Sequence, residues 1–162
     1  MRKLILFSFA LLTMAICAAP ASPGSAQADD TLRAPFVGAW RLAWLEEPDA
    51  TGKIYRADCS GLLIYTPDGH MSVQVMYRDP QSAKGAAPAQ YSQGGYEASY
   101  GTYEVNDAQT FTFHVEGALV RSLIGKDLKR VYEFSGKQLI VKSPDPNERW
   151  RVAWERSKEG SR

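Results

Sequence analysis

The sequence predicts an all-β fold, a single eight-stranded antiparallel up-and-down barrel with a loop or short helix over one end. From residue 36 onward, short runs rich in aromatic and β-branched residues are separated by Gly, Pro, Asp and Asn. Apolar and polar side chains alternate within several of these runs, as they do in half-buried strands. Because the turns are short, neighbouring strands should pair antiparallel, and eight strands in sequence order can close without free edges.

Eight segments qualify as strands, each bounded by residues that favour turns. Their predicted ranges are 36–46, 61–66, 71–77, 99–105, 110–116, 129–135, 138–142 and 149–156.

The clearest turn follows the second of these segments. Pro67 fixes a backbone angle for a type I turn, the Asp68 carboxylate can accept a hydrogen bond from the backbone, and Gly69 suits a left-handed residue. A three-residue loop over 67–69 sets the register of the hairpin. The residues that should then share one face are Leu63, Tyr65, Met71, Val73 and Val75.

Alternation is clearest late in the chain. Phe111, Phe113 and Val115 share one face of their segment, and Trp150, Val152 and Trp154 share one face of theirs. Since the outside of a soluble barrel faces water, these apolar sets should point inward. Segment 78–98 lacks the pattern and is too long for a hairpin loop. We expect it to form a flap, or a short helix beginning near Pro88, over one barrel mouth.

The N-terminal residues have the layout of a signal peptide. Two basic residues precede an apolar run from Leu4 to Cys17, and Ala26-Gln27-Ala28 supplies the small residues of a cleavage site. The run is shorter than the ~20 apolar residues of a membrane span. We therefore expect cleavage after Ala28 and a periplasmic or secreted protein without stable membrane insertion. A retained anchor is an alternative, and a lipoprotein is disfavoured by the bulky Ile16 beside Cys17.

The remaining chain has room for one domain. The expected organisation is a signal peptide over 1–28, an N-terminal extension over 29–35, a barrel domain over 36–156 and a C-terminal tail over 157–162. Of the 19 Lys and Arg residues, two lie in the signal segment, so 17 remain against 18 acidic residues. This balance argues against nucleic acid as a partner. Cys59 is then the one remaining cysteine, so no intrachain disulfide can form.

Several stretches together resemble a known family. Gly38-Ala39-Trp40 has the Gly-x-Trp form found at the start of the first strand in lipocalins. With GLLIYTPDGHMSV at 61–73, YGTYEV at 100–105, His114-Val115, Gly125, RVYEF at 130–134 and WER at 154–156, the chain from about 36 to 156 resembles the bacterial lipocalin-like domain family. The resemblance implies a lipocalin-like barrel, with no family-wide set of catalytic residues. Two departures are Gln93-Gly94-Gly95, where relatives often have a more helical segment, and Phe113, where a second histidine is often found.

The same resemblance suggests how the two ends of the barrel wall meet. Trp40, near the base of the first strand, can stack against a guanidinium of the last strand, with Arg156 the first choice. Such a contact would close the narrow end of the barrel with a cation–π interaction of roughly 0.5–2 kcal/mol.

Large inward side chains leave two possibilities for the interior, a ligand pocket or a barrel filled by its own residues. A pocket would suit a small hydrophobic or aromatic molecule, oriented by tyrosine hydroxyls. The residues expected to bind it are Leu63, Tyr65, Met71, Val73, Tyr103, Phe113, His114, Tyr132 and Trp154.

The sequence offers little for catalysis. Its two histidines, His70 and His114, lie far apart, without a Cys pair or a Glu-x-x-His motif, so we assign no metal, no cofactor and no catalytic residue. Alternation places His114 on the outer face, and it would gain a role only by pointing inward. The favoured function is binding in the barrel. An isomerase or cyclase using the same pocket is one alternative, and a solid barrel that binds another envelope component is the other.

Overall fold

The structure is a computed structural model that describes residues 31–79 and 91–157. The expected signal peptide, the helix expected near Pro88 and the tail beyond residue 157 lie outside the described residues. None of the helical segments in the described part of the chain has the length and apolar character needed to cross a lipid bilayer.

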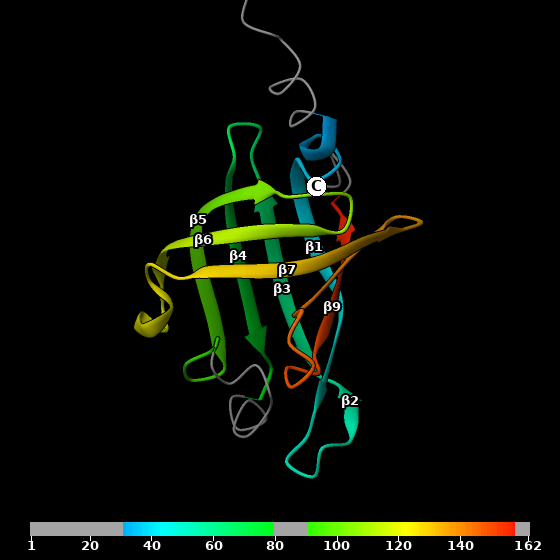
Figure 1. Cartoon of the computed structure of the whole chain (residues 1–162). Helices are drawn as coiled ribbons and strands as arrows, with labels where there is room; N and C mark the ends of the chain where they lie inside the picture. The colour runs from blue at the N-terminus through cyan, green and yellow to red at the C-terminus, as the bar shows by residue number, and fades with distance from the viewer. Residues whose placement is uncertain (1–30, 80–90, 158–162) are drawn as a thin grey trace, which may run out of the picture.

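The described residues form one closed antiparallel barrel with an additional short strand (Figure 1). The strands are β1 (Gly38–Pro48), β2 (Ile54–Arg56), β3 (Cys59–Tyr65), β4 (His70–Tyr77), β5 (Tyr96–Val105), β6 (Thr110–Ala118), β7 (Asp127–Ser135), β8 (Gln138–Lys142) and β9 (Arg151–Arg156). A 3₁₀ turn, η2 (Arg121–Leu123), links β6 to β7. The lipocalin-like, eight-stranded, up-and-down prediction is confirmed.

Strand β1 closes the barrel because it is long enough to pair with three partners. Its first half pairs with β3 at Gly38–Arg41, it pairs with β9 from Trp40 to Glu46, and its last residues pair with β2. A bulge between Leu42 and Trp44 interrupts the β9 ladder. Bulges bend a strand, which helps the sheet curl around and join its own first edge. In Figure 1 the curvature carries β6 and β7 across the front of β3 and β4.

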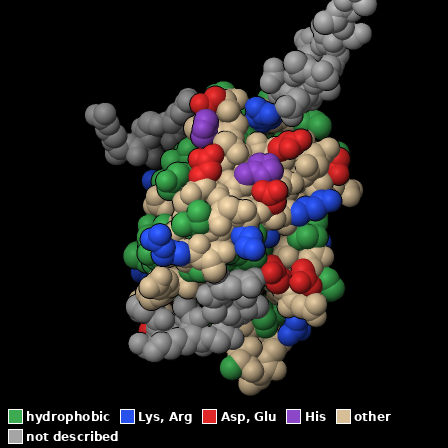
Figure 2. All heavy atoms as spheres, turned by 60° about the vertical axis from the view of Figure 1, so that its left-hand side comes forward, with side chains coloured by type: hydrophobic (Ala, Val, Ile, Leu, Met, Phe, Trp, Pro, Cys, Tyr) green, Lys and Arg blue, Asp and Glu red, His purple; other side chains and the backbone are tan. Residues whose placement is uncertain are grey.

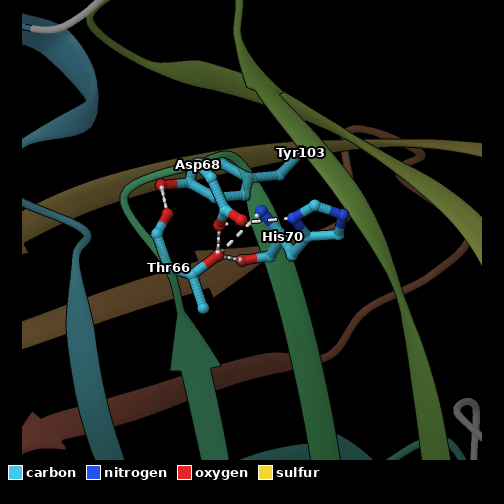
Figure 3. Close-up of polar contacts among 4 residues, drawn as sticks. All are labelled: Thr66, Asp68, His70 and Tyr103. Atoms are coloured by element: carbon cyan, nitrogen blue, oxygen red, sulfur yellow. Dashed lines mark hydrogen bonds and ion pairs between the residues drawn. The ribbon is translucent and has the colours of Figure 1, made fainter.

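The turn between β3 and β4 fixes the register that the sequence predicted. Gly69 has a φ of +88°, and Tyr65 and Leu63 face Met71 and Val73 across the hairpin. In this loop the Thr66 hydroxyl also donates a hydrogen bond to the Asp68 carboxylate (Figure 3). The hairpin therefore points its alternate apolar side chains to one face, the barrel interior.

Several predicted boundaries are wrong by two or three residues, including the end of β1, the start of β3, the end of β6 and the start of β7. Residue 36 lies in a turn before β1 rather than in a strand, β9 begins at Arg151 rather than at 149, and β5 begins three residues earlier than predicted, at Tyr96. Strand β2 was not predicted, because three residues between turn-forming segments are too few to show alternation.

One end of the barrel is closed by an aromatic cluster, and we call it the plugged end. Phe36 is completely buried there. Its ring centroid lies 4.7–6.0 Å from five other aromatic rings, mostly in edge-to-face geometry. Those rings belong to Tyr65, Tyr103, Phe111, Tyr132 and Phe134.

Trp40 and Arg156 join the two ends of the barrel wall at the plugged end, as predicted. The Arg156 guanidinium carbon lies 4.3 Å from the Trp40 ring centroid. The same guanidinium donates hydrogen bonds of 2.5 Å to the carbonyls of Val37 and Pro35. Arg156 therefore fastens the last strand to the segment that carries Phe36.

Candidate ligand-binding cavity

The barrel encloses a cavity between the plugged end and the opposite end. It offers about 80 Å³ to the centre of a water molecule. Since one water needs roughly 10–15 Å³ of such space, the interior has room for several waters or one small ligand. The barrel is therefore hollow, which was the first of the two possibilities for its interior.

Six of the nine residues predicted to bind a ligand line this cavity. They come from β3, β4, β6 and β9, and all lie at alternating inward positions. They are Leu63, Tyr65, Met71, Val73, Phe113 and Trp154. Val75 on β4, and Val141 and Val152 on the opposite wall, complete the apolar part of the lining.

Tyr103 and Tyr132 point inward but do not line the cavity, because they belong to the aromatic cluster at the plugged end. Their hydroxyls donate to backbone carbonyls, that of Tyr103 to Thr66 at 3.3 Å (Figure 3) and that of Tyr132 to Asp107 at 3.0 Å. Both hydroxyls thus fasten turns at that end rather than facing an interior guest.

His114 lies on the outer wall and does not line the cavity. Its side chain is 38% exposed, and its Nδ1 pairs with an Asp127 carboxylate oxygen at 2.7 Å. His70 pairs with Asp68 at 3.2 Å in the exposed β3–β4 turn. Figure 2 shows both histidines at the surface beside acidic side chains. Alternation along β6 had already indicated the outward direction for His114.

The cavity also has a polar lining that sequence reasoning missed. Glu97 and Ser99 of β5 and Arg130 of β7 border it, together with Tyr91 and Trp150. These residues lie near the start of β5, the start of β7 and the approach to β9, all at the end opposite the plug. We call this end the mouth end.

Arg130 packs against two aromatic rings at the mouth end. Its guanidinium carbon lies 5.1 Å from the Tyr91 ring centroid and 5.2 Å from that of Trp150. It also donates a 3.1 Å hydrogen bond to the carbonyl of Lys129. Planar guanidinium groups stack well on aromatic faces, so the two rings restrict where Arg130 points.

Glu148 fixes the two rings in turn. The Tyr91 hydroxyl donates to its Oε2 at 3.0 Å, and the Trp150 indole N–H donates to the same oxygen at 3.2 Å. The rings themselves pack edge to face with centroids 6.1 Å apart. The environment of Arg130 is therefore built from side chains that are themselves fixed by hydrogen bonds.

Glu97 is the acidic side chain of the cavity. Burial raises the pKa of its carboxyl group to about 7, and the positive charge of Arg130 opposes that rise. A carboxyl group with this pKa is about half protonated at neutral pH. The polar part of the cavity thus combines a full positive charge with an acid that is only partly ionised.

A second buried acid lies outside the cavity lining. Glu47, at the end of β1, is completely buried and accepts hydrogen bonds from the hydroxyls of Tyr55 at 2.6 Å and Tyr77 at 2.8 Å. These bonds tie β2 and β4 to β1.

Burial raises the pKa of the nearby Cys59 thiol to about 11, so this thiol is largely protonated at neutral pH.

The isomerase or cyclase alternative would need His114 or a glutamate to face inward beside Tyr103 or Tyr132. The described residues do not provide this arrangement. His114 lies on the outer wall, and Glu97, which does face inward, lies at the mouth end rather than in the aromatic cluster. Within ranges 31–79 and 91–157, no group of three or more His, Cys, Asp and Glu side chains could hold a metal ion.

The chain was compared with known proteins in three ways. A family model described as a lipocalin-like domain matches residues 37–157. A search of curated proteins finds no match. Among solved structures, the chain is similar to a lipoprotein, YedD, from Klebsiella pneumoniae, at 13% identity and a TM-score of 0.40, over 88% of this chain and 80% of that one. It is also similar to a lipocalin-like protein from Bacteroides uniformis, at 14% identity and a TM-score of 0.44, over 75% of this chain and 98% of that one.

Proposed function

Because this chain belongs to the lipocalin-like domain family, whose model spans most of its length, and because its barrel is hollow, we propose that it binds a small, mainly apolar molecule inside the barrel. The cavity carries this proposal. Its walls are aliphatic and aromatic, and its few polar groups gather at one end, which is the usual distribution in pockets for small organic ligands.

The position of the cavity favours binding over a purely structural role. The aromatic cluster around Phe36 blocks one end, so a guest would enter from the mouth end and lie against the apolar wall. Two tryptophans, Trp150 and Trp154, border the cavity and would report its occupancy.

A fluorescence titration with phenylnaphthylamine, an uncharged apolar fluorophore, tests this function. We expect saturable quenching of tryptophan emission with a matching rise in probe emission. Val75→Phe, and separately Val152→Phe on the opposite wall, should weaken binding at least about tenfold by occupying the cavity. Overpacking a core costs about 1–3 kcal/mol, so thermal unfolding must confirm that each variant is folded.

Ile64→Phe is the matched control. Ile64 lies on β3 but points outward, with 37% of its surface exposed. This variant should bind the probe as the parent protein does. A titration without saturation, or an equal loss of binding in the inward and outward variants, would argue against a ligand in the barrel.

We also propose that the protein is exported, to the periplasm or outside the cell. Support comes from the sequence of residues 1–28, with its basic start, short apolar run and Ala-x-Ala site. N-terminal sequencing of the protein from the periplasmic and extracellular fractions tests this. An N-terminus at Asp29 is expected, and an uncut chain held in the membrane fraction would contradict it.

A further inference from the structure

Arg130 places a positive charge on the lining of an otherwise largely apolar cavity. Arg130 is half-buried, so its guanidinium loses part of its hydration, which is costly unless other groups compensate for it. The two aromatic rings that flank Arg130 supply part of this compensation. Neither ring carries a full negative charge.

No carboxylate of the described residues neutralises Arg130 by direct contact. None of the ion pairs between described side chains includes it. Glu97 borders the same cavity, but burial raises the pKa of its carboxyl group to about 7, so it is only partly ionised. Among the described side chains that line the cavity, Arg130 is therefore the one that carries a full charge at neutral pH, while Glu148 lies behind the Tyr91 and Trp150 rings.

The geometry also leaves Arg130 fixed in position. Glu148 anchors the Tyr91 and Trp150 rings, and both rings contact the guanidinium. A fixed guanidinium presents parallel N–H donors that match the two oxygens of a carboxylate. Ser99, on the same strand as Glu97, adds a buried hydroxyl to the lining.

We propose that the ligand is a monocarboxylate with an apolar body, and that its carboxylate pairs with Arg130 while its body lies against the apolar wall. The proposal rests on the binding function above and specifies the chemistry of the ligand. A cationic head group would meet the guanidinium at close range and be repelled. An uncharged polar head group would leave the charge of Arg130 without a partner.

The test compares three small molecules with the same apolar chain: octanoate, octanol and octylamine. Each is titrated into the purified protein at neutral pH, and binding is followed by tryptophan fluorescence and by calorimetry. Octanoate should bind at least about tenfold more tightly than octanol, because charge-assisted hydrogen bonds are the stronger kind. Octylamine should bind more weakly than octanol.

Variants of Arg130 separate its role from bulk charge. Arg130→Gln should reduce octanoate affinity to that of octanol and leave octanol affinity within about twofold of the parent value. Arg130→Lys keeps the charge without the planar group and should fall between the two. Lys129→Gln is the matched control, because Lys129 is exposed and precedes Arg130 on the same strand. It removes the same charge and should leave octanoate binding unchanged.

Glu97→Gln distinguishes an anionic from a cationic ligand. It removes the residual negative charge opposite Arg130, so octanoate should bind as well as before or more tightly. A preference for octylamine that Glu97→Gln abolishes would overturn the proposal. Equal affinity for octanoate and octanol in the parent protein would overturn it too, as would equal losses in the Arg130→Gln and Lys129→Gln variants.

The two proposals fail in different ways. If phenylnaphthylamine binds but octanoate has no advantage over octanol, the barrel is a ligand site and the carboxylate preference is wrong. If phenylnaphthylamine and all three octyl compounds fail to bind, the binding function itself is wrong.

Discussion

Replacing Phe36 by alanine should destabilise the protein by about 4 kcal/mol, within the range of about 3–5 kcal/mol for buried Phe→Ala changes. The side chain is completely buried, and five aromatic rings lie within 6.0 Å of its centroid. The four strands that carry these rings, β3, β5, β6 and β7, cannot collapse into the space without breaking the barrel ladder, so a cavity should persist. Urea unfolding followed by circular dichroism measures the change in the free energy of unfolding.

Phe134→Ala provides the comparison within the same cluster. Its ring centroid lies 5.3 Å from that of Phe36, but 41% of its surface is exposed. Removing it should cost only about 1–2 kcal/mol, since less apolar area returns to water. The reasoning would be refuted if Phe36→Ala cost less than about 1.5 kcal/mol, or no more than Phe134→Ala.

Three further predictions concern the Trp40–Arg156 contact and the raised pKa values of Glu97 and Cys59. In a double-mutant cycle, Arg156→Met and Trp40→Leu should show a coupling energy of about 0.5–2 kcal/mol in urea unfolding, and a coupling of zero would remove the cation–π contact as a source of stability. Glu97 has a pKa of about 7 in the folded protein against 4.5 ordinarily, so the folded state holds the extra proton and stability should fall as pH rises between these values. Between about pH 5 and about pH 8, the free energy of unfolding of Glu97→Gln should therefore rise by on the order of 2–3 kcal/mol relative to that of the parent protein. Parallel pH profiles of the two proteins would contradict this. Alkylation of Cys59 by iodoacetamide at about pH 8, read by peptide mapping, should be at least about tenfold slower in the folded protein than in urea, because its pKa is raised to about 11; equal rates would show an accessible, ordinary thiol.

The wall of the barrel could be predicted because its residues alternate with a period of two. Leu63, Tyr65, Met71 and Val73 follow from one well-defined turn, since the loop length fixes which residues face each other. Phe36 shows the limit of this reasoning. Its apolar character is clear from the sequence, but its position as a plug before β1 depends on rings contributed by strands far along the chain.

The polar end of the cavity was missed for a different reason. Charged residues in the strands of a barrel usually face water, so a charged side chain such as that of Arg130 is not expected in the lining. Tyr132 was expected to face inward, and Arg130 lies two positions before it on the same strand, so alternation already placed Arg130 inside. The signal was therefore present for Arg130. Glu97 lies outside the predicted strand 99–105, and no such pattern covered it.

The pairing of β1 with β9 brings residues near opposite ends of the fold into one ladder, with Trp40 opposite Arg156. A nascent chain has produced every other strand before this partner exists, so β1 keeps an unpaired edge until synthesis is nearly finished. Contacts so distant in sequence also slow the search for the native topology, typically to milliseconds or seconds. Joining of the first and last strands should thus be a late event in folding, and any variant that shortens β9 leaves an edge open to pairing between molecules.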